Sequence, residues 1–218
     1  MHQELAGIRR LIKDPYCGLS HWVGAALSVA GLVALLVLAE GRPLHLVSFA
    51  LYGSSLVLLY TASALAHSLH CSAEAEQRLD RFDFAAIFLL IAGTYTPLCL
   101  VNLRGPWGWS LLATEWTLAA VGILLVTLRP GRSERLRPLM YLVMGWLVAL
   151  VPPAWAKLPA GAVAWLAAGG IAYSVGAAIY VFDRPHPWPG KFSAHDLWHT
   201  LVLVGSTCHF VLMVRYVA

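Results

Sequence analysis

Two histidines near the end of the sequence, His195 and His199, are four residues apart. On a helix this spacing puts both imidazoles on one face, where they can bind a single metal ion. Ser63 and His67 have the same spacing earlier in the chain, and Asp83 follows them. Three imidazoles and one water are the usual ligands of a catalytic zinc ion, and a nearby carboxylate such as Asp83 could take a proton from that water. These residues form a candidate zinc site if the fold brings them together.

The composition predicts a membrane protein. Of the 218 residues, 59% are hydrophobic and only 12% are charged. This charged fraction is about half of that expected of a soluble domain. The composition excludes a disordered chain and a coiled coil, and the net charge of +4 is too small and too scattered for nucleic-acid binding. The four cysteines have no CxxC spacing, so we interpret them as small apolar residues rather than as a disulfide framework.

Seven apolar runs are each long enough to cross a bilayer, which takes about 20 residues. The runs are continuous and do not alternate with polar residues, so we expect helices. They cover residues 19–39, 44–67, 83–103, 109–128, 139–156, 160–182 and 195–217. The predicted fold is an all-α, seven-transmembrane helix bundle over residues 19–218, preceded by an N-terminal segment, 1–18. The longest predicted connections are 68–82, 129–138 and 183–194.

Basic residues predict the orientation, because Lys and Arg are enriched in short cytoplasmic loops. Eleven of the 15 Lys and Arg residues lie in the N-terminal segment and the three long connections, and four lie on the opposite side. We therefore expect a cytoplasmic N-terminus and an extracytoplasmic C-terminus. In this orientation His67, Asp83, His195 and His199 all lie at cytoplasmic helix ends, which strengthens the candidate site.

Several other polar residues lie in or near the apolar runs, where ionisable groups are functional candidates. His70 follows His67 by about one helical turn and is an alternative ligand. His21 opens the first run and is close enough to support the site. His209 lies about 15 Å beyond His199 along a helix, so we expect a packed polar contact there. Glu115 has no functional interpretation.

The sequence argues against two other types of site. A retinal protein needs a lysine in its last helix for the Schiff base, but the lysines are Lys13, Lys157 and Lys191. The His195–His199 segment resembles the HExxH motif of zinc proteases superficially, but Asp196 replaces the glutamate and no suitably spaced third histidine follows. The alternative to a metal site is a set of interfacial histidines with unrelated hydrogen bonds.

Three motifs occur in order along the chain. They are Ser63-x-x-x-His67, Phe82-Asp83-Phe84 followed by Ile91-Ala92-Gly93-Thr94-Tyr95-Thr96-Pro97, and Ser193-Ala194-His195-Asp196-Leu197-Trp198-His199. Together they resemble the hemolysin III family, the bacterial branch of the progestin and adipoQ receptor family, which includes the adiponectin receptors. The resemblance implies a seven-helix bundle in the bacterial plasma (inner) membrane. It also implies a zinc ion near the cytoplasmic face, held by His67, His195 and His199, with Asp83 and Ser63 beside the metal-bound water.

The resemblance also implies membership of a broader group of membrane hydrolases that includes alkaline ceramidases. We therefore expect a zinc-dependent intramembrane hydrolase of a lipid amide or ester, with membrane lipids or a fatty-acyl substrate as partners. No nucleic acid or protein partner is predicted. Two alternatives remain: a non-catalytic sensor of lipid state with structural zinc, and, with less support, a cytolytic pore. Hydrolase and sensor differ in whether the fourth zinc position holds water facing an acyl-sized cavity or a fourth protein ligand such as His70.

Overall fold

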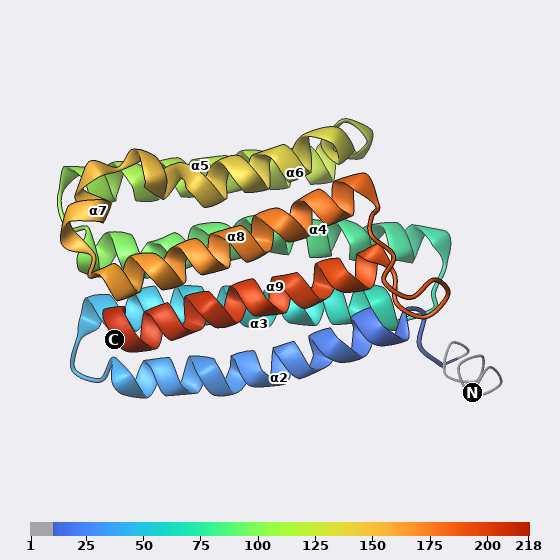
Figure 1. Ribbon diagram of the computed structural model, residues 1–218, viewed down its shortest axis with the longest axis horizontal. Coiled ribbons are helices and arrows are strands. Elements are labelled where there is room, and N and C mark those ends of the chain that lie inside the picture. Colours follow the sequence, from blue (N-terminus) through green and yellow to red (C-terminus); the bar gives the residue numbers. More distant parts are fainter. Residues whose placement is uncertain (1–10) are drawn as a thin grey trace.

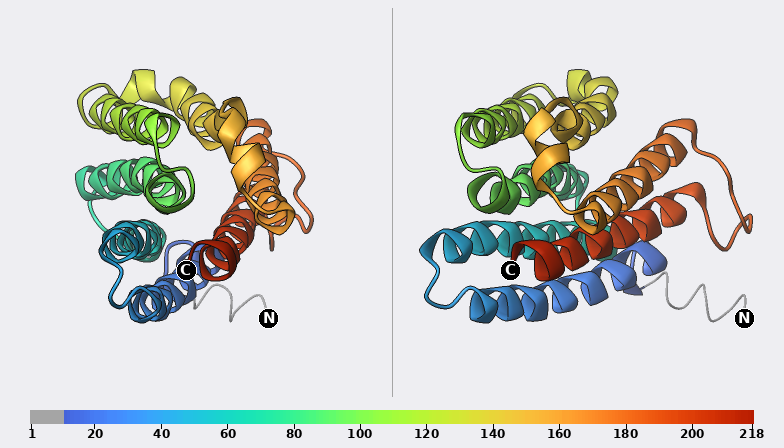
Figure 2. Two further views of the ribbon diagram at one scale, coloured as in Figure 1. Left: turned by 90° about the vertical axis from the view of Figure 1, so that its left-hand side faces the viewer. Right: turned by 60° about the vertical axis from the view of Figure 1, so that its left-hand side comes forward.

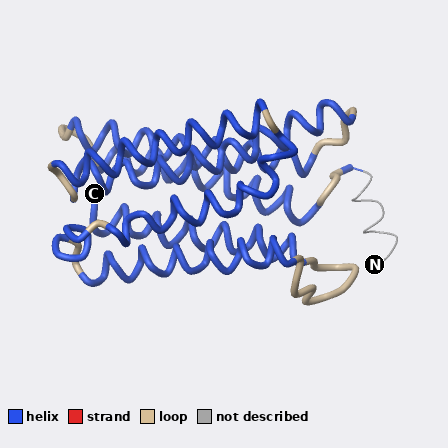
Figure 3. The backbone as a smooth tube through the Cα atoms, turned by 90° about the horizontal axis from the view of Figure 1, so that it is seen from above, coloured by secondary structure: helices blue, strands red, loops and turns tan. Residues whose placement is uncertain are grey.

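The computed structural model describes residues 11–218, apart from the side chains of residues 130–135. Arg9 and Arg10, two of the basic residues in the N-terminal segment, lie outside the described residues. The described part of the chain is helical. Figure 3 shows that its loops are confined to turns between the helices. The predicted all-α fold is therefore confirmed.

Six helices are long and apolar enough to cross a membrane within the described residues. They are α2 (Pro15–Leu38), α3 (Pro43–Ser68), α4 (Ala73–Pro97), α5 (Pro106–Leu128), α8 (Ala160–Phe182) and α9 (Ala194–Leu212). Helices α4 and α9 continue into short π-helical segments, η1 (Leu98–Asn102) and η3 (Met213–Val217). The chain is a multi-pass membrane protein.

The predicted fifth span, 139–156, is wrong as a continuous helix. Helix α6 (Pro130–Trp146) is followed by a 3-10 turn, η2 (Leu147–Leu150), and by the short helix α7 (Pro152–Lys157). Pro152 and Pro153 lack the backbone N–H that would continue the α6 hydrogen bonds, so the helix ends before them. The apolar segment that results, Leu136–Leu150, is shorter than the six spanning helices.

Two of the three predicted long connections are also wrong, because charged ends of helices were interpreted as loops. Helix α4 begins at Ala73, inside the predicted connection 68–82. The Ser72 side chain caps its first turn, which carries Glu74 and Glu76 at the favourable end of the helix dipole. Helix α6 likewise begins at Pro130, inside the predicted connection 129–138, and Pro is favoured at the first helical position. The third long connection is confirmed, because helix α8 ends at Phe182 and α9 begins at Ala194.

The helices follow one another around a ring in sequence order, and α9 closes the ring against α2 (Figures 1 and 2). Helix α2 begins, α3 ends and α9 begins at the same end of the bundle, at the right in Figure 1. We call this the N-terminal end of the bundle. The ring therefore brings together the helix ends that carry the three candidate histidine ligands.

The buried face of α2 carries mostly small residues and its outer face large apolar ones, as expected when lipid surrounds the protein. In α2, Gly18, Gly24 and Gly31 are on the buried face, whereas Leu27 is 66% exposed. Gly18, near the start of α2, packs against the C-terminal end of the neighbouring helix α3. A Cβ atom there would lie 2.6 Å from the Ser68 hydroxyl and 3.3 Å from the His67 carbonyl oxygen. The start of α2 can therefore pack directly against the end of α3.

Candidate metal centre

His67, in the last turn of α3, is held by Asp14 at two points. The Asp14 backbone N–H donates to the His67 carbonyl oxygen at 2.8 Å. His67 Nδ1 lies 2.9 Å from Asp14 Oδ2. This hydrogen bond lowers the pKa of the Asp14 carboxyl, which favours its ionised form. An ionised carboxylate accepts from Nδ1–H, so the bond fixes the imidazole ring and leaves Nε2 able to bind a metal ion.

His195 and His199 lie in the first two turns of α9, as their spacing predicted. A capping box fixes this helix start: the Ser193 hydroxyl accepts from the Asp196 N–H, and the Asp196 carboxylate accepts from the Ser193 N–H at 2.7 Å. The two histidine Nε2 atoms are 3.1 Å apart. Two ring nitrogens at this distance share either a proton or a metal ion.

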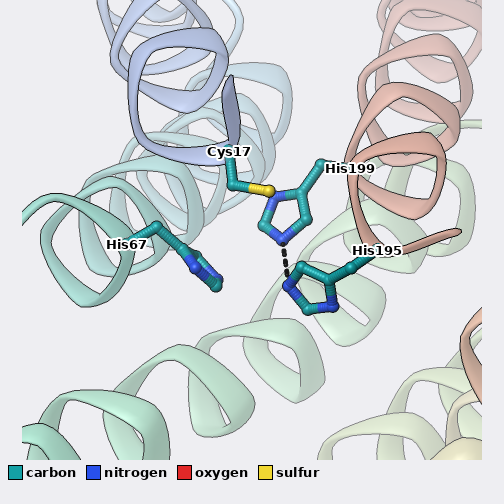
Figure 4. Close-up of side chains that lie close together, drawn as sticks. All are labelled: Cys17, His67, His195 and His199. Atoms are coloured by element: carbon teal, nitrogen blue, oxygen red, sulfur yellow. Dashed lines mark hydrogen bonds between the residues drawn. The ribbon is translucent and has the colours of Figure 1, made fainter. Parts of the chain in front are cut away.

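The three histidines form one cluster, and Cys17 belongs to it (Figure 4). One ligand atom from each of Cys17, His67, His195 and His199 lies within 4.8 Å of the others. Imidazole nitrogen and cysteine sulfur are the ligands that zinc prefers, and it binds four of them in a tetrahedral arrangement. The cluster therefore fits a zinc-type metal ion.

His21 supports the cluster from α2. His199 Nδ1 lies 3.0 Å from His21 Nε2, and both histidines are buried. Metal-binding histidines almost always use their second ring nitrogen in such a contact, which sets the tautomer and the ring orientation. The contact with His21 thus orients the His199 ring, as the hydrogen bond with Asp14 orients the His67 ring.

The contacts of Cys17 and Asp14 at this site were not predicted from the sequence. Cys17 was interpreted as a small apolar residue; it is indeed buried, but its thiol donates to Asp196 Oδ1 at 3.2 Å. One signal could have identified it: Cys17 precedes His21 by four residues, the spacing that places both on one helix face. No comparable signal marks Asp14, which lies before the first apolar run.

Asp83 and Ser63 lie beside the cluster but are not among its four ligand residues. Both side chains are buried, and they lie next to each other. Both line the same cavity as His21 and His199. The structure thus brings Asp83 and Ser63 to the cluster at a position where they can contact a molecule in the cavity.

This cavity runs along the interior of the bundle and is mostly apolar. Residues of α4 and η1 line it from Asp83 to Leu98, a stretch of wall of about 22 Å at the usual helix rise. Side chains from α6, α8 and α9 complete the wall, including Trp146, Tyr173 and His209. The histidine cluster lies near one end of this apolar channel. A second, more open pocket between α6 and α8 has His195 in its wall.

The remaining candidates lie outside the cluster. His70 is exposed and is not one of the four clustered ligand residues. His209 is a packed polar contact as predicted, with Nε2 3.3 Å from the Leu166 carbonyl oxygen. Glu115 is fully buried in α5, and neither of its carboxylate oxygens has a hydrogen-bond partner among the described residues.

Comparisons with known proteins identify the family of the chain. Residues 9–210 match the family described as Haemolysin-III related. Hemolysin-3 of Bacillus cereus is 38% identical, covering 100% of this chain and 98% of its own length. The Hemolysin-3 homolog of Bacillus subtilis (strain 168) is also 38% identical, over 91% of each chain. Heptahelical transmembrane protein ADIPOR2 of Oryza sativa subsp. japonica is 35% identical over 68% of this chain and 72% of its own. The chain therefore belongs to the haemolysin-III related family of membrane proteins.

Proposed function

We propose that this protein is a zinc-dependent hydrolase that cleaves an amide or ester bond of a lipid within the membrane. One observation carries the proposal: the histidine cluster and the buried Asp83–Ser63 pair lie together at one end of a long apolar cavity. A metal-binding group, a candidate general base and an apolar binding site are the parts that such a reaction needs.

The proposed roles follow from the contacts of each residue. His67, His195 and His199 hold the zinc ion, which when bound lowers the pKa of water and polarises a carbonyl oxygen. Asp83 takes a proton from the attacking water and gives it to the leaving amine or alcohol. The Ser63 hydroxyl, which lines the same cavity, helps to hold the water or the substrate.

The cavity supports a lipid with a long acyl chain as the substrate class. Its wall extends about 22 Å along α4 and η1, more than the depth of one leaflet of the hydrocarbon core, about 15 Å. The pocket between α6 and α8 lies on the outer side of the bundle and includes His195 in its wall. We propose that the lipid enters from the bilayer there, with its scissile bond near the cluster.

The proposal includes an orientation in the plasma membrane. The N-terminal end of the bundle faces the cytoplasm, because most of the basic residues belong to this end. The histidine cluster then lies near the cytoplasmic surface and the C-terminus lies outside.

A second candidate function is a non-catalytic sensor of the lipid state with a structural metal ion. One observation favours it: the Cys17 sulfur offers a fourth protein ligand, and structural zinc sites are closed by four such ligands.

Single-residue substitutions test the proposed hydrolase activity. Asp83→Asn should keep the metal and the fold but lower fatty-acid release from ceramide-like and phospholipid substrates by about 10²–10⁴-fold, because it removes a general base. His67→Ala should lose metal and thermal stability as well, because it removes a ligand. Asp80→Asn, one helical turn before Asp83, is the matched control and should retain activity.

Two results contradict this proposal. If Asp83→Asn loses zinc as fully as His67→Ala, the aspartate is a ligand and not a base. If the wild-type protein releases no fatty acid from any of these lipids, the sensor is the better interpretation.

A further inference from the structure

Cys17 occupies an unusual position for a cysteine that only fills space. It lies in the first turn of α2 with an exposed fraction of 1%, and its sulfur points toward the three histidines (Figure 4). The sulfur and the three imidazole nitrogens all lie within 4.8 Å of one another. These four ligands come from three helices, the consecutive helices α2 and α3 and the distant helix α9.

Two of the three histidines already use one ring nitrogen in a hydrogen bond outside the cluster. His67 Nδ1 is hydrogen-bonded to Asp14, and His199 Nδ1 is hydrogen-bonded to His21. Their remaining nitrogens, both Nε2, therefore face the same space as the Cys17 sulfur. One cysteine and three histidines would give a closed tetrahedral zinc site with no position for water.

The Asp196 carboxylate is a hydrogen-bond acceptor for the Cys17 thiol, so the sulfur has a partner other than a metal ion. The Cys17 S–H donates to Asp196 Oδ1 at 3.2 Å, while the Ser193 N–H and hydroxyl both donate to Oδ2. The capping box thus fixes the carboxylate, and Oδ1 stays directed at the sulfur.

We propose that Cys17 is a fourth, exchangeable ligand of the metal ion. In the closed state the Cys17 sulfur would hold the metal ion, and the thiol proton would leave together with the water of the fourth position. In the open state a proton and a water would return, and the thiol would donate to Asp196 Oδ1 as it does in this structure. The thiol therefore determines whether water can bind beside Asp83. This inference rests on the metal ion of the proposed function but not on hydrolysis.

Cobalt replacement tests the bond directly. A thiolate bound to Co²⁺ gives an intense near-ultraviolet charge-transfer band that imidazole ligands do not give. The wild-type protein loaded with Co²⁺ should show this band, and Cys17→Ser should lose it. Cys99→Ser is the matched control, because Cys99 is also buried but lies in η1, away from the cluster, and this variant should keep the band. A wild-type spectrum without the band, or an equal band in Cys17→Ser, overturns the proposal.

A second measurement uses the wild-type protein alone, so it does not depend on the folding of a variant. Zinc loading should slow alkylation of Cys17 at least about tenfold, measured by mass spectrometry of the Cys17 peptide, because a metal-bound thiolate is shielded. Alkylation of Cys71, which is exposed, should not change. Equal labelling of Cys17 with and without zinc contradicts the proposal. A cobalt band without fatty-acid release would support Cys17 as a ligand while contradicting the hydrolase.

Discussion

The Asp14 carboxylate lies 2.9 Å from His67 Nδ1, and the Asp14 backbone N–H also bonds to the His67 carbonyl oxygen. The segment before α2 is thereby attached to the last turn of α3. The same segment leads directly into Cys17. Asp14 therefore couples the orientation of one candidate ligand to the position of another.

Asp14→Ala should weaken zinc binding about 10- to 100-fold, the usual effect of losing a hydrogen-bonding partner of a metal ligand. Competition with a chelator of known affinity measures this change. Glu76→Gln is the control, because Glu76 is a nearby carboxylate that pairs with Lys13 at 3.4 Å and does not contact the cluster. Equal zinc affinity in Asp14→Ala and wild type would mean that the His67 ring is held by other contacts.

Ser193→Ala should lower both protein stability and zinc affinity, because it removes the cap that fixes the start of α9. Loss of an N-cap costs about 1 kcal/mol. The melting temperature in detergent and the chelator competition report the two effects. Ser72→Ala removes the corresponding cap of α4, which carries none of the four cluster ligands, so it should reduce stability alone. A similar loss of zinc affinity in both variants would contradict a specific role for the α9 cap.

These caps and contacts also show what could be predicted from the sequence. The sequence identified three ligand residues, His67, His195 and His199. Helix ends on the same side of a membrane lie at the same depth, so residues that are distant in the sequence can lie close together there. Cys17 and Asp14 were missed because their contribution depends on how closely α2 approaches α3 at Gly18, which no single-helix pattern contains. Packing between helices is a tertiary property.

The sequence predicted correctly that the spans are helices, but it predicted less well how many there are and where each begins and ends. Hydropathy alone joined residues 139–156 into one span, although Pro152 and Pro153 prevent a continuous helix there. The start of α4 was not predicted because its first turns are charged and therefore resemble a loop. The Ser72 side chain caps these turns, so they are helical. Apolar length predicts the membrane-embedded part of a helix, whereas proline and capping residues determine where it begins and ends.

Gly170→Leu should shorten the acyl chain that the protein accepts. Gly170 lines the cavity, and a Cβ atom there would meet Trp146 at no less than 3.4 Å, so a larger side chain can enter the cavity space. Crowding of this kind costs about 1–3 kcal/mol, so hydrolysis of long-chain lipids should fall about 5- to 100-fold relative to short-chain lipids. Ile171→Phe, on the exposed side of α8, is the control. An unchanged chain-length preference would place the acyl chain elsewhere.

The orientation is tested with reporters fused after Ala218. The excess of basic residues at the N-terminal end predicts that the C-terminus is extracytoplasmic. A reporter that is active only outside the cytoplasm should therefore work, and one that is active only in the cytoplasm should not. The opposite pattern would put the histidine cluster at the outer surface.

Metal content tests the histidine cluster most directly. Elemental analysis of the purified wild-type protein should find about one zinc ion per chain, because the ligand atoms of the cluster lie within 4.8 Å of one another. His195→Ala removes one imidazole and should lose most of this zinc. Equal zinc content in the two proteins would contradict a metal centre built on His67, His195 and His199.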